Sequence, residues 1–343
     1  MVLAAPDRTD PTNNVGEMNA DVLMRVTGLA VRIRVPGGAL RAVDGVSFVL
    51  RRGETLGLVG ESGSGKTITA LAVMRLLETP PAEVAGGSVT FADRELLALP
   101  EHAMADVRGR SLSMIFQEPM TSLNPLMTIG RQIAEPLGRH LHISNADAAR
   151  RARELLSSVG IPDAARVAAG YAHQLSGGMR QRVTIAIAIA CRPAILIADE
   201  PTTALDVTIQ AQILELLTAL QSEMGMAMLL ITHDLAVVAE TAHRVAVMYA
   251  GRIVETAPVA QLFAEPRHPY TRGLLRSVPQ IERVPPPTLP EIPGVVPSLD
   301  ALPQGCAFAP RCPLSDATCR AKRPELAPVT PDHDAACWKA LDG

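Results

Sequence analysis

A glycine-rich segment of eight residues constrains the fold of this chain more than any other feature of its sequence. It fits G-x-x-x-x-G-K-[ST] without a mismatch, it follows the apolar run Thr55–Val59, and it precedes a helical pattern over 66–77. Such a loop cradles phosphate, because its glycines let backbone N–H groups converge and the following helix N-terminus adds partial positive charge. We therefore predict a nucleotide triphosphate site. Its residues are Gly60, Glu61, Ser62, Gly63, Ser64, Gly65, Lys66 and Thr67.

Two acidic residues, Asp199 and Glu200, end the apolar run Ile195–Ala198. An acid at the end of a buried strand must be paired or bind metal. With a phosphate loop upstream, Asp199 is predicted to hold Mg²⁺, directly or through water, together with the Thr67 hydroxyl. Glu200 is predicted to orient and deprotonate the attacking water. Lys66 should reach the β- and γ-phosphates.

A second candidate phosphate cradle lies at Leu175–Gln181, where a serine and two glycines precede a helical pattern. The segment, with Ser176, Gly177, Gly178 and Gln181, resembles the signature sequence of ATP-binding-cassette (ABC) proteins. In that family two cassettes pair head to tail. The resemblance therefore implies that this signature contacts the ATP held by a partner cassette.

Three single residues extend the resemblance to ABC proteins. Gln117 matches the Gln loop, which contacts Mg²⁺ or the water and senses the transporter. His233 matches the switch histidine that contacts the γ-phosphate, and Asp206 matches the loop that crosses the dimer interface. All these motifs occur in family order over residues 22–256. One departure is Ile33, which stands where the family usually stacks an aromatic ring on adenine.

The chain divides into three predicted parts. Residues 1–20 form a disordered leader, and strand–helix alternation over 21–265 predicts an α/β nucleotide-binding domain. The expected P-loop ABC fold has a mainly parallel sheet with helices, an antiparallel section over 22–50, and a helical subdomain at about 118–178. Past residue 266, many prolines argue against regular elements, so we expect a small appended module over 266–343.

A finer resemblance, to the D-type ATPase subunits of dipeptide and oligopeptide importers, covers nearly the whole chain beyond the leader. Its segments are Phe116–Pro125, His268–Leu275 and Gly305–Pro313. It implies a peripheral subunit on the cytoplasmic face of the membrane, which energises peptide import. The implied partners are two transmembrane permeases, a second ATPase subunit, identical or related, and indirectly an extracytoplasmic peptide-binding protein. Nickel importers share much of this pattern, so nickel or another small solute is an alternative substrate.

Four cysteines lie in the appended module, at positions 306, 312, 319 and 337. Their spacing is neither the paired C-x2-C of zinc ribbons nor the C-x2-C-x2-C run of bacterial ferredoxins. Four thiolates can hold a [4Fe–4S] cluster or Zn²⁺, or stay unliganded. In D-type subunits this pattern implies a [4Fe–4S] cluster on Cys306, Cys312, Cys319 and Cys337, with a structural role.

Other classes of protein are disfavoured. The longest apolar run, Ile185–Cys191, is far shorter than the roughly 20 residues that span a bilayer. The net charge of −3 gives no reason to expect nucleic acid as a partner. Cassette ATPases that act on DNA insert long coiled coils before the signature, and ribosome-associated ones carry two cassettes and basic linkers. This chain has neither feature. The chain retains Lys66, Glu200 and His233, which argues against a regulatory subunit whose ATP sites are inactive.

Overall fold

The computed structural model describes residues 21–118, 122–203, 205–278 and 291–340; the predicted leader lies outside them. Near the N-terminus, a four-stranded antiparallel sheet has the order β2-β1-β4-β5. The β1–β2 pair confirms the predicted antiparallel section. The strands are β1 (Val22–Val35), β2 (Gly38–Arg51), β4 (Ala82–Phe91) and β5 (Arg94–Glu95).

An eight-stranded sheet forms the centre of the molecule, in the order β11-β12-β10-β9-β3-β8-β7-β6. Neighbours from β9 to β6 run parallel, and every residue of β3 and β8 is buried. Burial on both faces is why these strands read as unbroken apolar runs. The strands are β3 (Thr55–Val59), β6 (Leu112–Ile115), β7 (Ile195–Asp199), β8 (Ala227–Thr232), β9 (Arg244–Tyr249), β10 (Arg252–Pro258), β11 (Ala327–Thr330) and β12 (His333–Ala335).

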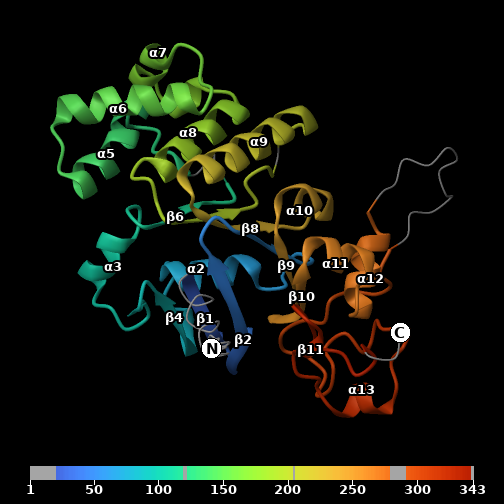
Figure 1. Ribbon diagram of the computed structural model, residues 1–343. Helices are drawn as coiled ribbons and strands as arrows, with labels where there is room; N and C mark the ends of the chain where they lie inside the picture. The colour runs from blue at the N-terminus through green and yellow to red at the C-terminus, as the bar shows by residue number, and fades with distance from the viewer. Residues whose placement is uncertain (1–20, 119–121, 204, 279–290, 341–343) are drawn as a thin grey trace, which may run out of the picture.

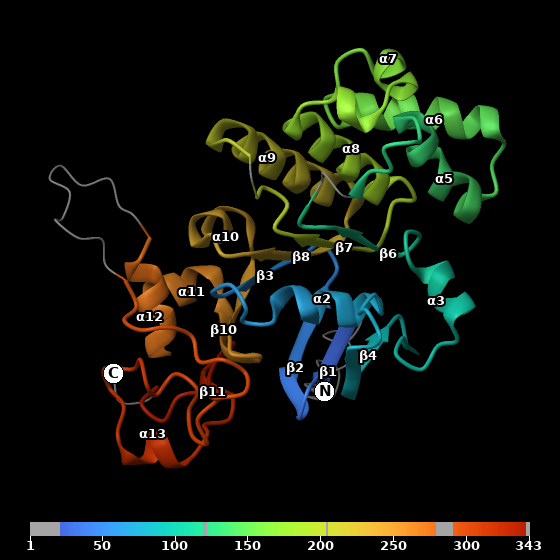
Figure 2. The same cartoon turned by 180° about the vertical axis from the view of Figure 1, so that it is seen from behind.

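Helices cover both faces of this sheet. Helix α2 lies on one face, and α8 and α9 lie on the other, where α5, α6 and α7 form an outer helical layer (Figures 1 and 2). No described helix is long and apolar enough to cross a membrane. The helices are α2 (Lys66–Met74), α3 (Glu101–Val107), α5 (Ile129–Leu141), α6 (Asn145–Ser158), α7 (Ala164–Ala169), α8 (Gly177–Ile189), α9 (Val207–Met224), α10 (Leu235–Thr241), α11 (Val259–Ala264), α12 (Pro269–Arg276) and α13 (Ala317–Ala321).

Two sequence expectations need correction. The helix after the phosphate loop ends at Met74 rather than 77, because Arg75 adopts a left-handed backbone (φ 53°) that closes its last turn. The region past 266 does contain regular elements, including α12, α13 and the β11–β12 hairpin. The hairpin itself is local, but its place in the sheet was hidden because β12 pairs with β10, which is distant in sequence.

A buried carboxylate joins this last strand to the rest of the sheet. Glu255 of β10 is completely buried and accepts hydrogen bonds from the backbone N–H of Arg267 (2.6 Å) and of His268 (2.9 Å). Its third partner is the imidazole of His333 in β12, at 2.7 Å. Because a buried carboxylate needs such partners, the C-terminal segment is part of the main fold.

Candidate nucleotide-binding site

The predicted site residues meet at one edge of the central sheet. Gly60, Gln117 and His233 follow the ends of β3, β6 and β8, and Asp199 is the last residue of β7. These strands are parallel, so their carboxyl ends lie together, where ligands bind in open α/β sheets.

The phosphate loop is closed around the Lys66 side chain. The Lys66 Nζ donates to the carbonyl oxygens of Gly60 (2.8 Å) and Glu61 (3.0 Å). Burial lowers the pKa of Lys66, against the opposing charges of Glu200 and Asp199. Gly65 has φ 104°, and a Cβ there would lie 2.8 Å from the Ala42 carbonyl oxygen, so only glycine fits.

Thr67 and Asp199 supply oxygen atoms suited to a hard cation. The Thr67 hydroxyl donates to Asp199 Oδ1 at 3.2 Å, although the two residues belong to different elements. Burial raises the pKa of Asp199 to about 6, and the neighbouring Glu200 adds to the shift. A hydroxyl and a carboxylate next to a phosphate loop fit Mg²⁺, whose charge would favour the ionised carboxylate.

Glu200 is the centre of a hydrogen-bonded group at the same edge. Its Oε2 accepts from Gln117 Nε2 at 3.0 Å and from the Thr203 hydroxyl at 2.7 Å, and its Oε1 lies 3.2 Å from His233 Nδ1. Burial raises the pKa of Glu200, but the bonds from Thr203 and His233 outweigh it and bring the pKa below its usual value. An ionised carboxylate held in this way suits a general base.

Thr203 is a partner of Glu200 that no sequence motif predicted. The threonine lies three residues after the acid, and the structure places its hydroxyl on the carboxylate because the chain turns at Glu200 (φ 46°). The only signal in the sequence was that Thr203 carries a hydroxyl and lies in the polar segment after β7, the strand that ends at Asp199.

The signature residues do not join this group. Ser176 caps α8 by accepting from the backbone N–H of Met179 at 3.3 Å, and Gln181 is buried within α8. Asp206 caps α9 through the N–H of Ile209 at 3.0 Å. Helices α8 and α2 lie on opposite faces of the sheet (Figure 1). No described hydrogen bond joins the signature to the phosphate loop.

Comparisons with known proteins agree with this geometry. The ABC transporter family model matches residues 43–203, and the model of the oligopeptide/dipeptide transporter C-terminal region matches residues 254–319. The "Probable peptide ABC transporter ATP-binding protein y4tR" of Sinorhizobium fredii is 54% identical over 94% of this chain and 96% of its own length. The chain is an ABC transporter ATPase.

Two further comparisons support the assignment to the ABC ATPases. The "Oligopeptide transport ATP-binding protein OppD" of Bacillus subtilis is 49% identical over 92% of this chain and 88% of its own length. The solved ABC cassette MJ0796, a dimer in a post-hydrolysis state with ADP and phosphate, aligns with a TM-score of 0.62. The two chains are 26% identical, and the alignment covers 69% of this chain and 98% of the solved chain.

The four C-terminal cysteines of this ABC ATPase line one small cavity, with a volume of about 10 Å³, together with Phe308 and Trp338. Burial raises the thiol pKa of Cys306, Cys312 and Cys337, and the neighbouring thiols add to the shift at each. Within the described ranges, no three His, Cys, Asp or Glu side chains are arranged as a metal site. Four thiols are a donor set that suits a soft metal. In this structure, however, they are not arranged closely enough to form a metal site.

Proposed function

We propose that this ABC ATPase energises the import of di- or oligopeptides through two transmembrane permeases, from the cytoplasmic face of the membrane. The oligopeptide/dipeptide C-terminal region at 254–319 carries this proposal, because it lies beyond the match to the general ABC family. The names of the two relatives point to the same substrate class. A peptide-binding protein outside the membrane would deliver the substrate.

In the proposed mechanism, Lys66 and the loop N–H groups bind the β- and γ-phosphates. Thr67 and Asp199 would hold Mg²⁺, which would supply neutralisation of the phosphate charge. Glu200 takes a proton from the attacking water, while Gln117 and His233 hold the water and the γ-phosphate in line. Hydrolysis then needs no covalent intermediate on the protein.

A second ATPase subunit completes the proposed site. The opposite positions of α2 and α8 favour a head-to-tail pair, in which Ser176, Gly177 and Gly178 of one cassette close on the ATP of the other. Val207, which directly follows Asp206, is 84% exposed, as a residue that packs in an interface would be. The dimeric state of the MJ0796 cassette supports this arrangement.

The permease is proposed to dock in a groove of about 1070 Å³ between α5, α6 and α7. Small residues line much of it, including Ala134, Gly138, Ala149 and Ala165, which leaves room for a helix. The nearby Leu126 is 87% exposed. Closure of the cassette pair would move this groove and so alternate the access of the permeases.

We propose that the four cysteines hold a [4Fe–4S] cluster that stabilises the C-terminal region. The support is their gathering around one apolar cavity, which must widen to admit a cluster. The test is iron and sulfide analysis of protein purified without oxygen, with about four irons per chain expected. Zinc alone, or no metal, would contradict the cluster.

The transport proposal is tested with the ATPase assembled with its permeases and binding protein in vesicles. ATP-dependent uptake of labelled peptides is expected, and Lys66→Ala should abolish it. Nickel uptake without peptide uptake would replace the peptide proposal. Peptide uptake that continues with Lys66→Ala would overturn the assignment of the ATP site.

A further inference from the structure

The side chain of Arg311 leaves the cysteine-rich region and reaches the phosphate loop. Arg311 lies in the turn between Cys306 and Cys312, where its N–H donates to the Phe308 carbonyl at 2.9 Å. Its side chain is only 5% exposed, and its Nε donates to the Pro293 carbonyl at 2.9 Å. The arginine is therefore fixed by the module that the cysteines belong to.

Its guanidinium forms a two-point ion pair with Glu61, the second residue of the phosphate loop. Nη1 lies 2.7 Å from Oε2 and Nη2 lies 3.0 Å from Oε1. Paired bonds of this kind fix both distance and orientation. The Glu61 backbone N–H also donates to the Tyr270 hydroxyl at 2.8 Å. Both the side chain and the backbone of Glu61 are thus held from the C-terminal region.

The surroundings of this ion pair strengthen it. The Arg311 guanidinium carbon lies 5.9 Å from the ring centres of Tyr249 and Phe308, and Tyr249 packs against Tyr270 with ring centres 4.6 Å apart. Aromatic faces attract a cation and exclude water, so charges here interact more strongly than in solvent.

We propose that Arg311 is a positioning residue of the ATP site, which neutralises Glu61 and keeps its carboxylate in the ion pair, so that no unpaired negative charge faces the triphosphate. Without Arg311, the Glu61 carboxylate would place an unpaired negative charge next to the triphosphate. The C-terminal module thereby sets the nucleotide affinity of the cassette. This inference rests on the proposed binding of ATP at residues 60–67.

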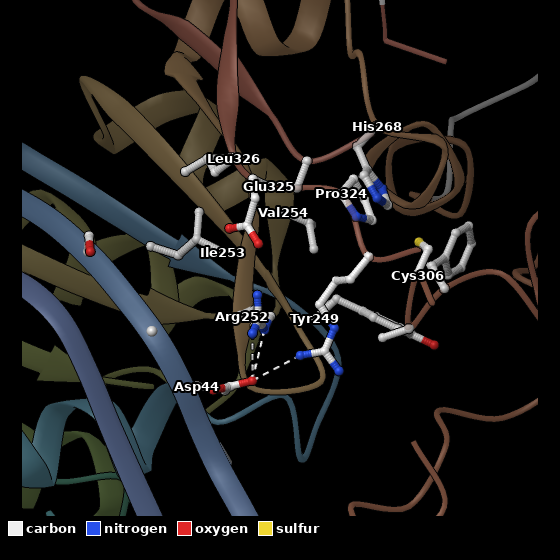
Figure 3. A pocket seen from close by; sticks show the side chains of 16 residues that line it. Asp44, Tyr249, Arg252, Ile253, Val254, His268, Cys306, Pro324, Glu325 and Leu326 are labelled. Atoms are coloured by element: carbon white, nitrogen blue, oxygen red, sulfur yellow. Dashed lines mark hydrogen bonds and ion pairs between the residues drawn. The ribbon is translucent and has the colours of Figure 1, made fainter. Parts of the chain in front are cut away.

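Arg323 offers a matched control, because it also joins the module to the cassette but does not touch the loop. Its Nη1 lies 3.1 Å from Asp44 Oδ2. The same oxygen receives Arg252 Nη2 at 2.7 Å (Figure 3). Removing Arg323 therefore weakens docking of the module while Asp44 keeps a second partner.

The test measures the Kd of MgATP for the full-length protein. Arg311→Gln should weaken binding about tenfold, the effect of one unpaired charge near the phosphates. Arg323→Gln should stay within about twofold of the native protein. Adding Glu61→Gln to Arg311→Gln should restore most of the affinity, since no carboxylate is left unpaired.

Three results would overturn the proposal: native affinity in Arg311→Gln, an equal loss in Arg323→Gln, or no restoration in the double variant. If Arg311→Gln does not fold, the Kd of MgATP for the single variant Glu61→Gln decides, because this variant leaves the C-terminal module unchanged. Its binding should be tighter than native, because the Arg311 charge is then no longer neutralised beside the triphosphate, and native or weaker binding counts against the proposal. Native MgATP affinity in Lys66→Ala would instead show that the assumed ATP site is wrong.

Discussion

The amide nitrogen of Gln117 donates to the Glu200 carboxylate over 3.0 Å and so joins the end of β6 to the end of β7. Gln117 also begins the segment that leads into the helical layer of α5, α6 and α7. A displacement of that layer would therefore reach the proposed general base through one side chain. This contact gives a short physical route between the groove proposed for the permease and the chemistry.

Glu200→Gln should keep ATP binding and lower hydrolysis at least about 100-fold, because an amide cannot accept the proton of the attacking water. Binding of labelled ATP and release of phosphate measure the two properties separately. Glu215→Gln, a change on the solvent-facing side of α9, is the control and should hydrolyse ATP at the native rate. Turnover by Glu200→Gln close to the native rate would remove this residue from its role.

Ile33→Tyr should tighten ATP binding roughly threefold to tenfold, because an aromatic ring stacks on adenine and isoleucine does not. Ile33 pairs with Leu40 in the β1–β2 hairpin and is partly exposed, so a larger side chain has room. The Kd of ATP is compared with that of Ile33→Leu, which adds no ring. Equal affinities in the two variants would show that the base lies elsewhere.

Ala149→Trp should uncouple the ATPase from its permeases, because the indole fills the groove between α5, α6 and α7. Ala146→Trp is the matched control: both alanines are exposed on α6, but only Ala149 lines the groove. Co-purification with the permeases and peptide uptake are the measurements. Intact assembly of the Ala149 variant would place the docking surface on another face.

Stability should fall in acid partly because of His268. This histidine is completely buried, burial lowers its pKa from 6.5 to about 3, and its Nδ1 accepts from the Tyr270 N–H at 3.0 Å. The unfolded chain therefore binds a proton that the native state excludes. The stability from the neutral ring is complete above pH 6.5 and is lost between about pH 6.5 and 3, by up to about 1.4 kcal/mol per pH unit.

His268→Asn provides the comparison for this acid effect. Asparagine retains a cap for the Tyr270 N–H but does not titrate. Thermal unfolding between pH 7 and 5 should show a shallower fall of Tm in the variant than in the native protein. Parallel curves would mean that His268 does not control the acid sensitivity.

Local motifs predicted the fold and the candidate site well where function depends on neighbouring residues. The loop before Lys66 and the acids after Ile197 carry their chemistry within a few positions, and the structure brings them to one sheet edge. The ion pair of Arg311 with Glu61 spans 250 positions, and no pattern in either segment reveals it. Pairing of β12 with β10 was hidden for the same reason, because strand partners distant in sequence depend on the folded topology.

The place of His333 in the central sheet has a consequence for biosynthesis. This imidazole completes the hydrogen bonds of Glu255, yet it lies in β12, which follows every other strand that the structure describes. Domains generally fold as units while the ribosome still extends them. Here the sheet cannot reach its full width until β12 has been synthesised, so a product terminated before this strand leaves the buried Glu255 without its third hydrogen-bond partner.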